Sequence, residues 1–164
     1  EFVRIHEQPL ILGGMGSAAF DGEGVATSAR DIVSDGILRG YVLGSYSARR
    51  LELQTTGNAG GVHNLTIDTG DQNLEQMISG IDEGFLVTEL IGFGINNVTG
   101  DYSRGAAGLW IENGEIAYPV EEVTVAGNLK DIFQNIAAIG NDVDPRRSTR
   151  CGSILVEGLT IAGD

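Results

Sequence analysis

Short apolar runs, separated by glycine-containing turns, dominate this chain and predict β-strands more often than helices. The clearest example is a hairpin over residues 109–118, where two alternating runs meet at Asn113-Gly114. Asn-Gly supplies the two positive φ angles that a two-residue type I′ turn requires, and the loop length sets the register of the flanking strands. The cross-strand pairs that we predict are Ile111 with Ile116 and Leu109 with Tyr118.

Further turns and apolar runs extend this pattern along the chain. Asp35-Gly36 predicts a second turn, between strands at Arg30–Ser34 and Ile37–Leu43. Other apolar runs have the length and the flanking turn residues that are typical of strands. These runs are Val3–Ile11, Thr66–Asp68, Val120–Val125 and Ile154–Ile161.

Two segments instead show the spacing of amphipathic helices, with apolar residues three and four positions apart. Asn128 can cap the first helix, and Gly140 would end it. Asp71 or Asn73 can cap the second, which would end near Gly84. Both stripes are typical of ordinary core contacts. They consist of Leu129, Ile132, Phe133 and Ile136 in the first helix, and of Leu74, Met77, Ile78 and Ile81 in the second.

The fold class that follows is α+β, predominantly antiparallel β and barrel- or sandwich-like, with two amphipathic helices. The regular alternation of strands and helices that marks a doubly wound sheet is missing. A length of 164 residues fits a single domain with its own core. The 25 glycines are about twice the usual share and show no collagen period, so they indicate turns and close backbone approaches.

Charge excludes several classes of partner. Ten basic residues against 23 acidic ones give a formal net charge of −13. Such a surface repels nucleic-acid phosphates and anionic membranes, so neither is an expected partner. One cysteine permits no internal disulfide, which suits a reducing compartment. No apolar stretch approaches the roughly 18 residues of a membrane span, and no signal peptide is visible.

Two local motifs resemble well-known sites but lack the context that those sites need. Residues 14–19 match a dinucleotide-binding fingerprint, yet the glycine-rich residues 20–24 that follow oppose the helix that would receive a pyrophosphate. His6-Glu7 begins like a zinc-peptidase motif, but no second histidine follows at the spacing that a helical zinc site requires. We interpret the first as a glycine loop and the second as no metal site by itself.

Cys151 is the one side chain with three open interpretations. It could act as a nucleophile with His63 as its base, it could ligate a metal, or it could be an inert small side chain. Arg146, Arg147 and Arg150 lie close in sequence and would favour a thiolate if they pointed at it.

Two glycine-rich stretches are the best candidates for contact with a peptide. Residues 57–64 combine glycines with polar side chains, so another backbone could approach closely and pair by strand addition. Residues 100–108 form a similar stretch, in which an internal Asp101–Arg104 pair could fix a loop. The candidate peptide-binding residues are Gly57, Asn58, Gly60, Gly61, His63, Asn64, Asp101, Tyr102, Ser103 and Arg104.

The same stretches carry a family resemblance. Together with other segments in the same order, they resemble the PmbA (TldE) branch of the TldD/PmbA family over nearly the whole chain. The resemblance is to the C-terminal half of the family protein, as a single domain over residues 1–164 with the N-terminal half absent. The remaining segments are 86–90, 110–115, 125–131, 139–142, 151–153 and 161–163.

The resemblance implies a cytoplasmic TldD–TldE heterodimeric metallopeptidase that cleaves unstructured peptides. Associated substrates are microcin precursors and an antitoxin, and an older label for the family is modulator of DNA gyrase. The zinc-binding His-Glu-x-x-x-His motif of the TldD branch is missing here, and only Cys151 stands where the late zinc-ligating cysteine of that branch belongs. The family pattern therefore places zinc in a TldD-type partner, with no cofactor and no catalytic residue in this chain.

Three functions follow as hypotheses. The first is a non-catalytic partner subunit that binds unfolded peptides together with a TldD-type subunit, or after self-association. The second is a free-standing hydrolase that uses Cys151 and His63. The third is a purely structural assembly module.

Overall fold

A computed structural model describes residues 2–163, and their contacts group them into two compact units. Unit 1 runs up to Thr69 and also includes Val143–Gly152. Unit 2 is made of Gly70–Asp142 and of the residues from Ser153 onward.

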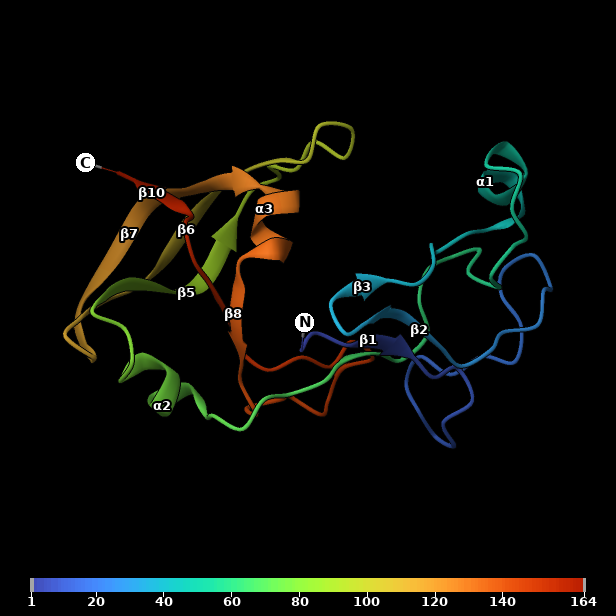
Figure 1. The fold of residues 1–164 in the computed structure, drawn as a ribbon, viewed down its shortest axis with the longest axis horizontal. Coiled ribbons are helices and arrows are strands. Elements are labelled where there is room, and N and C mark those ends of the chain that lie inside the picture. Colours follow the sequence, from blue (N-terminus) through green and yellow to red (C-terminus); the bar gives the residue numbers. More distant parts are fainter. Residues whose placement is uncertain (1, 164) are drawn as a thin grey trace. The chain divides into compact units, whose positions relative to one another are not determined.

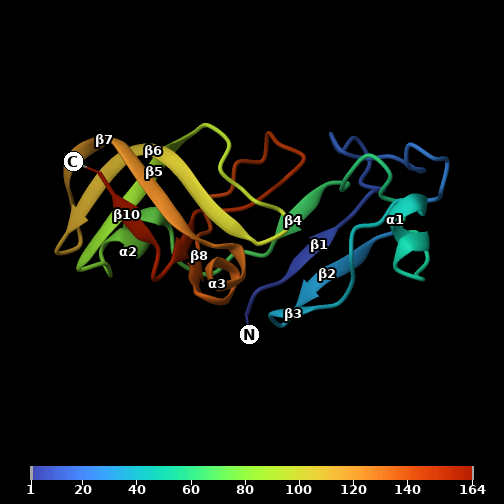
Figure 2. The same ribbon diagram turned by 90° about the horizontal axis from the view of Figure 1, so that it is seen from above.

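Unit 1 is built on a four-stranded antiparallel sheet in the order β3-β2-β1-β4. Short β1, Ile5–Glu7, is central and pairs with both β2 and β4. Figure 1 shows β1 beside β2, and Figure 2 shows β4 on the other side of β1. A short helix and several glycine-containing loops complete the unit. The other elements are β2 (Arg30–Ser34), β3 (Ile37–Leu38), α1 (Ser45–Arg50) and β4 (Leu65–Ile67).

The predicted turn at Asp35-Gly36 is confirmed, since both residues have positive φ, 55° and 71°. Strand β3 stops at Leu38, so the predicted extension to Leu43 is wrong. The chain beyond it is held by other groups: the Tyr41 carbonyl accepts a hydrogen bond from Arg30, and the Leu43 N–H donates to Thr56. These contacts replace the ladder that a longer strand would have made.

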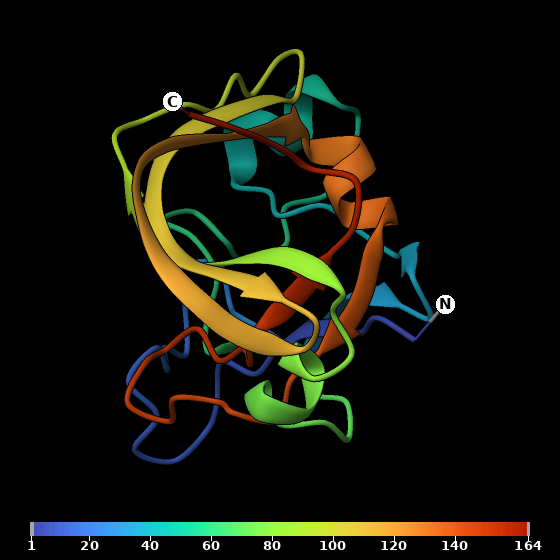
Figure 3. The same cartoon turned by 90° about the vertical axis from the view of Figure 1, so that its left-hand side faces the viewer.

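Unit 2 contains a four-stranded antiparallel sheet in the order β10-β7-β6-β5, whose long middle strands are strongly bent in Figure 3. A separate antiparallel pair, β8 with β9, belongs to the same unit. The strands are β5 (Glu83–Ile91), β6 (Asp101–Glu112), β7 (Glu115–Asn128), β8 (Ile136–Ile139), β9 (Ile154–Val156) and β10 (Thr160–Ala162). The helices are α2 (Leu74–Ile78) and α3 (Leu129–Gln134).

The β6–β7 hairpin confirms the predicted turn and corrects part of its register. Asn113 and Gly114 have φ values of 51° and 79°, as a type I′ turn requires, and Ile111 pairs with Ile116. The predicted Leu109–Tyr118 pair is wrong, because a bulge inserts one extra residue on β7 and Tyr118 pairs with Trp110 instead. A local turn motif therefore sets the register only as far as the first irregularity.

Both predicted helix starts are confirmed, but both helices end early. Asn73 caps α2 in a capping box with Gln76, and Asn128 caps α3 by accepting a hydrogen bond from the Lys130 N–H. The predicted ends of α3 near Gly140 and of α2 near Gly84 are wrong. After α3 the chain enters β8 at Ile136, so strand pairing overrides the helical spacing there, whereas a turn at Ser79-Gly80 ends α2.

The remaining strand predictions hold in part. Residues 154–161 form two strands, because Gly158 makes a turn with φ of 77° between β9 and β10. Strand β1 covers only three residues of the predicted Val3–Ile11. Helix α1 was not predicted; its N-cap, Gly44, offers no side-chain cap and leaves no capping signal in the sequence.

The core of unit 2 is small and apolar. Ala106, Val123 and Val125 are buried, and larger side chains from neighbouring strands pack against them. The predicted antiparallel α+β class is confirmed, with three short helices instead of two. Within residues 2–163 both four-stranded sheets are open, so neither closes into a barrel. Across the same residues, the structure has no helix whose length and apolarity would let it cross a membrane.

Candidate functional site

The glycine-rich stretch 57–64 is anchored on a buried carboxylate. Glu7 extends from the central strand of unit 1 and is only 1% exposed. It accepts hydrogen bonds from Arg30 Nε at 2.7 Å, from Asn58 Nδ2 at 2.9 and 3.1 Å, and from the His63 N–H at 3.0 Å. We call Glu7, Arg30, Asn58 and His63 the Glu7 cluster. It ties both halves of the stretch to β1 and β2.

Asn58 has its hydrogen-bonding capacity filled within the chain. Its amide nitrogen donates to Glu7 and to the Gly61 carbonyl, and its oxygen accepts from Arg30 Nη2 at 3.0 Å and from Thr56 Oγ1 at 2.7 Å. A side chain with all of its bonds made has none left for a ligand. Asn58 therefore shapes the stretch and positions its neighbours.

Asp21 holds the same stretch through a second set of bonds. Its carboxylate accepts the backbone N–H groups of Glu23, Val25 and Ala59, each at 2.9 Å. The pKa of Asp21 is lowered from its ordinary value of 3.8, first by the Ala59 N–H and then by the other two, while burial acts in the opposite direction. The charged form of Asp21 therefore stabilises the folded loop.

This linkage predicts how acid affects the unit. Because the folded pKa lies below the unfolded one, the stabilisation is present above the unfolded value and is lost as pH falls through the folded one. The free energy of unfolding of the wild type should exceed that of Asp21→Asn by a constant amount near neutral pH, and this difference should shrink below about pH 4. Urea unfolding at several pH values measures it, and a difference that stays constant down to pH 3 would contradict the assignment.

Between these anchors, the tip of the stretch remains open. Gly60 and Gly61 have φ values of 113° and 122°, and a Cβ added to either would meet nothing within 4 Å. Within residues 2–163, no hydrogen bond involves the backbone of Gly60 or Val62. An exposed backbone in a conformation that favours glycine is thus held on a rigid base.

The other residues predicted in this stretch have structural contacts. Gly57 is buried, and its carbonyl lies 3.2 Å from His63 Nε2. Asn64 is 7% exposed; its side chain accepts from the Gly16 N–H and donates to the Gln8 carbonyl and to Ser17. Asn64 thereby organises the loop that resembled a dinucleotide fingerprint. The next element after that loop is strand β2 and the first helix begins only at Ser45, so the glycine-loop interpretation is confirmed.

The second predicted stretch is a strand in unit 2, so its description as a loop is wrong. Residues 101–104 begin β6 and pair with β7 on one edge. On the other edge, the Ser103 N–H donates to the Gly94 carbonyl at 2.7 Å and the Asn96 N–H donates to the Asp101 carbonyl at 2.9 Å. With both edges paired, this stretch cannot accept a peptide by strand addition.

The charged side chains at the start of β6 have separate partners. Asp101 accepts from Thr99 Oγ1 at 2.6 Å, and Arg104 Nη2 donates to the Leu90 carbonyl at 3.2 Å. The Asp101–Arg104 pair considered above is not formed among the described residues. Arg104 Nε is buried, and no partner for it exists in the described part of the chain.

Tyr102 packs against the apolar core of unit 2, whereas its neighbours face outward. Asp101 and Ser103 line an open hollow of about 370 Å³ together with residues 93–96. The ten predicted residues are therefore distributed over both units, with the first six in unit 1 and the last four in unit 2.

Cys151 lies half-buried at the end of the segment that rejoins unit 1, and its Sγ donates to the Gly152 carbonyl at 3.0 Å. Just before it, Arg150 bonds through its backbone to Leu65 and Ile67 of β4. Among the described residues, no three His, Cys, Asp or Glu side chains are grouped to hold a metal ion. These side chains by themselves do not fit a zinc centre.

The residues that the sequence analysis missed are the anchors. Glu7, Arg30 and Asp21 hold the stretch, but each is far from it in sequence and none belongs to a complete motif. The one available signal was Glu7 within the strand-like Val3–Ile11, where a buried carboxylate requires a partner. That signal does not identify the partner.

Residues 1–163 match the family described as PmbA/TldA metallopeptidase C-terminal domain. The chain is 52% identical to metalloprotease PmbA of Escherichia coli O157:H7 over 163 residues, covering 99% of this chain and 36% of that protein. It is 43% identical over 164 residues to a metalloprotease PmbA homolog of Buchnera aphidicola, covering 100% of this chain and 37% of that protein.

Solved structures agree with the sequence relatives. A Bacteroides thetaiotaomicron protein named as a candidate modulator of DNA gyrase has a TM-score of 0.91 at 36% identity, covering 99% of this chain and 37% of that one. TldE from Thermococcus kodakarensis has a TM-score of 0.81 at 26% identity, covering 99% of this chain and 40% of that one.

Fold and sequence together define a domain of a protease-related protein. The chain belongs to the PmbA/TldD metallopeptidase family. It spans slightly more than a third of the length of the relatives that it matches, at 36% and 37%.

Proposed function

We propose that this chain is the non-catalytic, peptide-contacting part of a PmbA/TldE-type subunit, which works with a zinc-bearing TldD-type subunit in a cytoplasmic peptidase. Its substrates are unstructured peptides, of the class to which microcin precursors and antitoxins belong. Relatives named metalloprotease PmbA and the similarity to a TldE structure support this role. The observation that carries the proposal is the exposed, anchored backbone at Gly60–Val62.

A peptide without fixed structure offers its own backbone more reliably than any side chain. A site that tolerates many sequences therefore reads N–H and C=O groups. Gly60 and Gly61 leave no side-chain bulk in front of such groups, and the Glu7 cluster keeps the tip in one conformation. Preorganisation of this kind reduces the entropy that binding must overcome.

In unit 2, the backbone of residues 101–104 is already paired on both edges, so only the side chains of these residues can contact a ligand. Arg104 has one buried donor, Nε, without a partner among the described residues, and Asp101 and Ser103 face an open hollow. In this proposal Arg104 assists in holding a carbonyl or a carboxylate of the peptide. An effect on gyrase would then be indirect, through peptides that act on it, because a net charge of −13 disfavours DNA.

A single backbone N–H offers a direct test of the proposal. In a subunit reconstituted with its TldD-type partner, Val62→Pro removes the N–H, whereas Val62→Ala keeps it. We expect Val62→Pro to lower kcat/KM for an unstructured peptide by about tenfold, and Val62→Ala to stay within about threefold of wild type. Both variants should assemble as wild type does in size-exclusion chromatography. Equal kcat/KM for the two variants would refute a backbone contact at Val62.

A further inference from the structure

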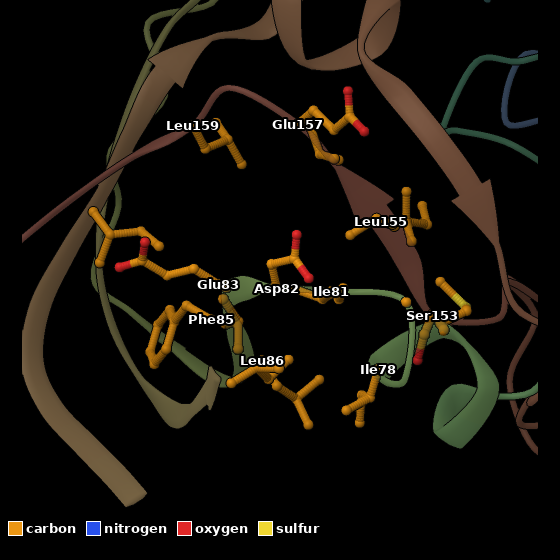
Figure 4. A pocket seen from close by; sticks show the side chains of 18 of the residues that line it. Ile78, Ile81, Asp82, Glu83, Phe85, Leu86, Ser153, Leu155, Glu157 and Leu159 are labelled. Atoms are coloured by element: carbon orange, nitrogen blue, oxygen red, sulfur yellow. The ribbon is translucent and has the colours of Figure 1, made fainter. Parts of the chain in front are cut away.

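The bent sheet of unit 2 partly surrounds a cavity of about 710 Å³. Its walls come from α2, from β5, and from β9 with the segment that leads into β10 (Figure 4). Pockets of roughly 300–1,000 Å³ accommodate ligands that are largely buried when bound. This cavity therefore has room for more than one large side chain.

Two strand edges flank the cavity. Five consecutive residues of β5, Glu83–Val87, line it, and so do all three residues of β9. Side chains of a strand alternate between its faces, so a run of consecutive lining residues indicates that the strand presents its edge to the space. Strand β5 is the last strand of its sheet, and among the described strands β9 pairs with β8 alone. Unpaired strand edges of this kind are templates for another extended chain.

The walls between these edges are apolar. Met77, Ile78, Ile111 and Val125 are buried and form part of them. Protein interiors are normally packed to crystal-like density, and an apolar space of this size leaves many dispersion contacts unmade. An apolar side chain that enters it would make those contacts.

The charges around the cavity have one sign. Asp82, Glu83 and Glu157 line it, whereas its described lining contains no lysine, arginine or histidine. Figure 4 shows Asp82 and Glu83 beside Phe85 and Leu86, while Glu157 extends from the other wall near Leu159. Within residues 2–163, none of the three carboxylates is in an ion pair. Carboxylates on two walls favour an occupant with more than one positive charge.

We propose that this cavity binds an extended peptide segment in which large apolar residues stand directly beside lysine or arginine. The peptide backbone pairs with the free edge of β5, its apolar side chains fill the space, and its basic side chains meet Asp82, Glu83 and Glu157. This inference rests on the proposed function and deepens it, because it adds a further peptide site and names the class of sequence that the site selects.

Fluorescence anisotropy tests the site on the isolated chain without any peptidase readout. The probe is a fluorescein-labelled peptide with the core Leu-Phe-Arg-Lys between glycines. Two comparison peptides carry Ser-Ser-Arg-Lys and Leu-Phe-Glu-Glu in place of that core. We expect saturable binding of the first peptide, with an affinity about tenfold or more above that of either comparison. Equal affinity for the serine peptide, or no saturable binding, would overturn the proposal.

A matched pair of variants separates the cavity from the overall acidity of the chain. Glu157→Lys and Glu121→Lys make the same charge change at exposed glutamates, but only Glu157 lines the cavity. Glu157→Lys should weaken binding by about tenfold, and Glu121→Lys by less than about threefold. Equal weakening by both variants would mean general electrostatic attraction and would overturn the site.

A third variant separates this proposal from the contact at Gly60–Val62. Val62→Pro should leave the preference for the Leu-Phe-Arg-Lys peptide over the serine peptide unchanged, since the cavity lies in unit 2 and Val62 belongs to unit 1. If Val62→Pro abolished this preference, the selectivity would be assigned to the loop and the cavity proposal would fall. If the cavity variants had no effect while Val62→Pro still reduced peptidase activity, the proposed function alone would stand.

Discussion

Replacing Glu7 with glutamine should lower the free energy of unfolding by about 3–5 kcal/mol, the usual cost of removing one partner of a buried ion pair. Glu7 accepts from Arg30, from Asn58 and from the His63 N–H, and it is 1% exposed. The variant leaves the Arg30 charge without its counterion. It also places an amide NH₂ group, which is itself a donor, opposite the donors of Asn58 and His63. The loss is therefore larger than that of a single hydrogen bond.

Urea unfolding monitored by circular dichroism measures this effect. Glu121→Gln is the matched control, because it makes the same chemical change at an exposed position on β7. We expect the control to stay within about 0.5 kcal/mol of wild type. A Glu7→Gln variant as stable as the control would show that the buried cluster does not hold the loop.

Replacing Gly108 with alanine should destabilise the chain by about 1–3 kcal/mol or more, the range of an overpacked core. Gly108 is buried within β6, and a Cβ there would run into the Leu86 carbonyl of the neighbouring strand. The ring of Phe85 lies 3.0 Å from the same point. Gly108 adjoins register shifts on both sides of β6, so it permits the close approach that the bent sheet requires.

Gly105 provides the comparison within the same strand. A Cβ at Gly105 would make ordinary contacts with Ile91, beginning at 3.4 Å, and its φ is not positive. Gly105→Ala should therefore be neutral or stabilise the chain by up to about 1 kcal/mol, because alanine restricts the unfolded chain more than glycine does. Thermal melting of the two variants measures the difference, and equal melting temperatures would contradict the packing argument.

The sequence predicted those features that depend on a few adjacent residues. Asn113-Gly114 and Asp35-Gly36 determine their own turns, since two neighbouring residues with positive φ are sufficient. Asn73 and Asn128 determine helix starts for a similar reason, because a cap bonds to backbone two or three residues away. The family resemblance also lies in the sequence, because it depends on the order of motifs along the chain.

Features that depend on distant segments were predicted poorly. The residues expected to extend α3 became β8, because Ile136 pairs with Val156 across 20 positions of sequence. The start of β6 looked like a loop, because its mostly polar residues between Gly100 and Gly105 give no apolar alternation. Its pairing partners are on β7 and at residues 94–96. The extra residue in β7 changed a register that the turn alone could not specify.

The candidate site also combines features that could be recognised in the sequence with features that depend on distant segments. The glycines at 60 and 61 could be recognised in the sequence as permissive backbone, because conformational freedom is a property of the residue itself. Only tertiary structure decided that Glu7, Arg30 and Asp21 anchor the stretch, and that Asn58 serves the chain rather than a ligand. The cavity between β5 and β9 was likewise invisible in the sequence, because it arises from the curvature of a sheet and the placement of two unpaired edges. Local chemistry determined the turns and caps, whereas long-range pairing and burial decided which groups remain available for a ligand.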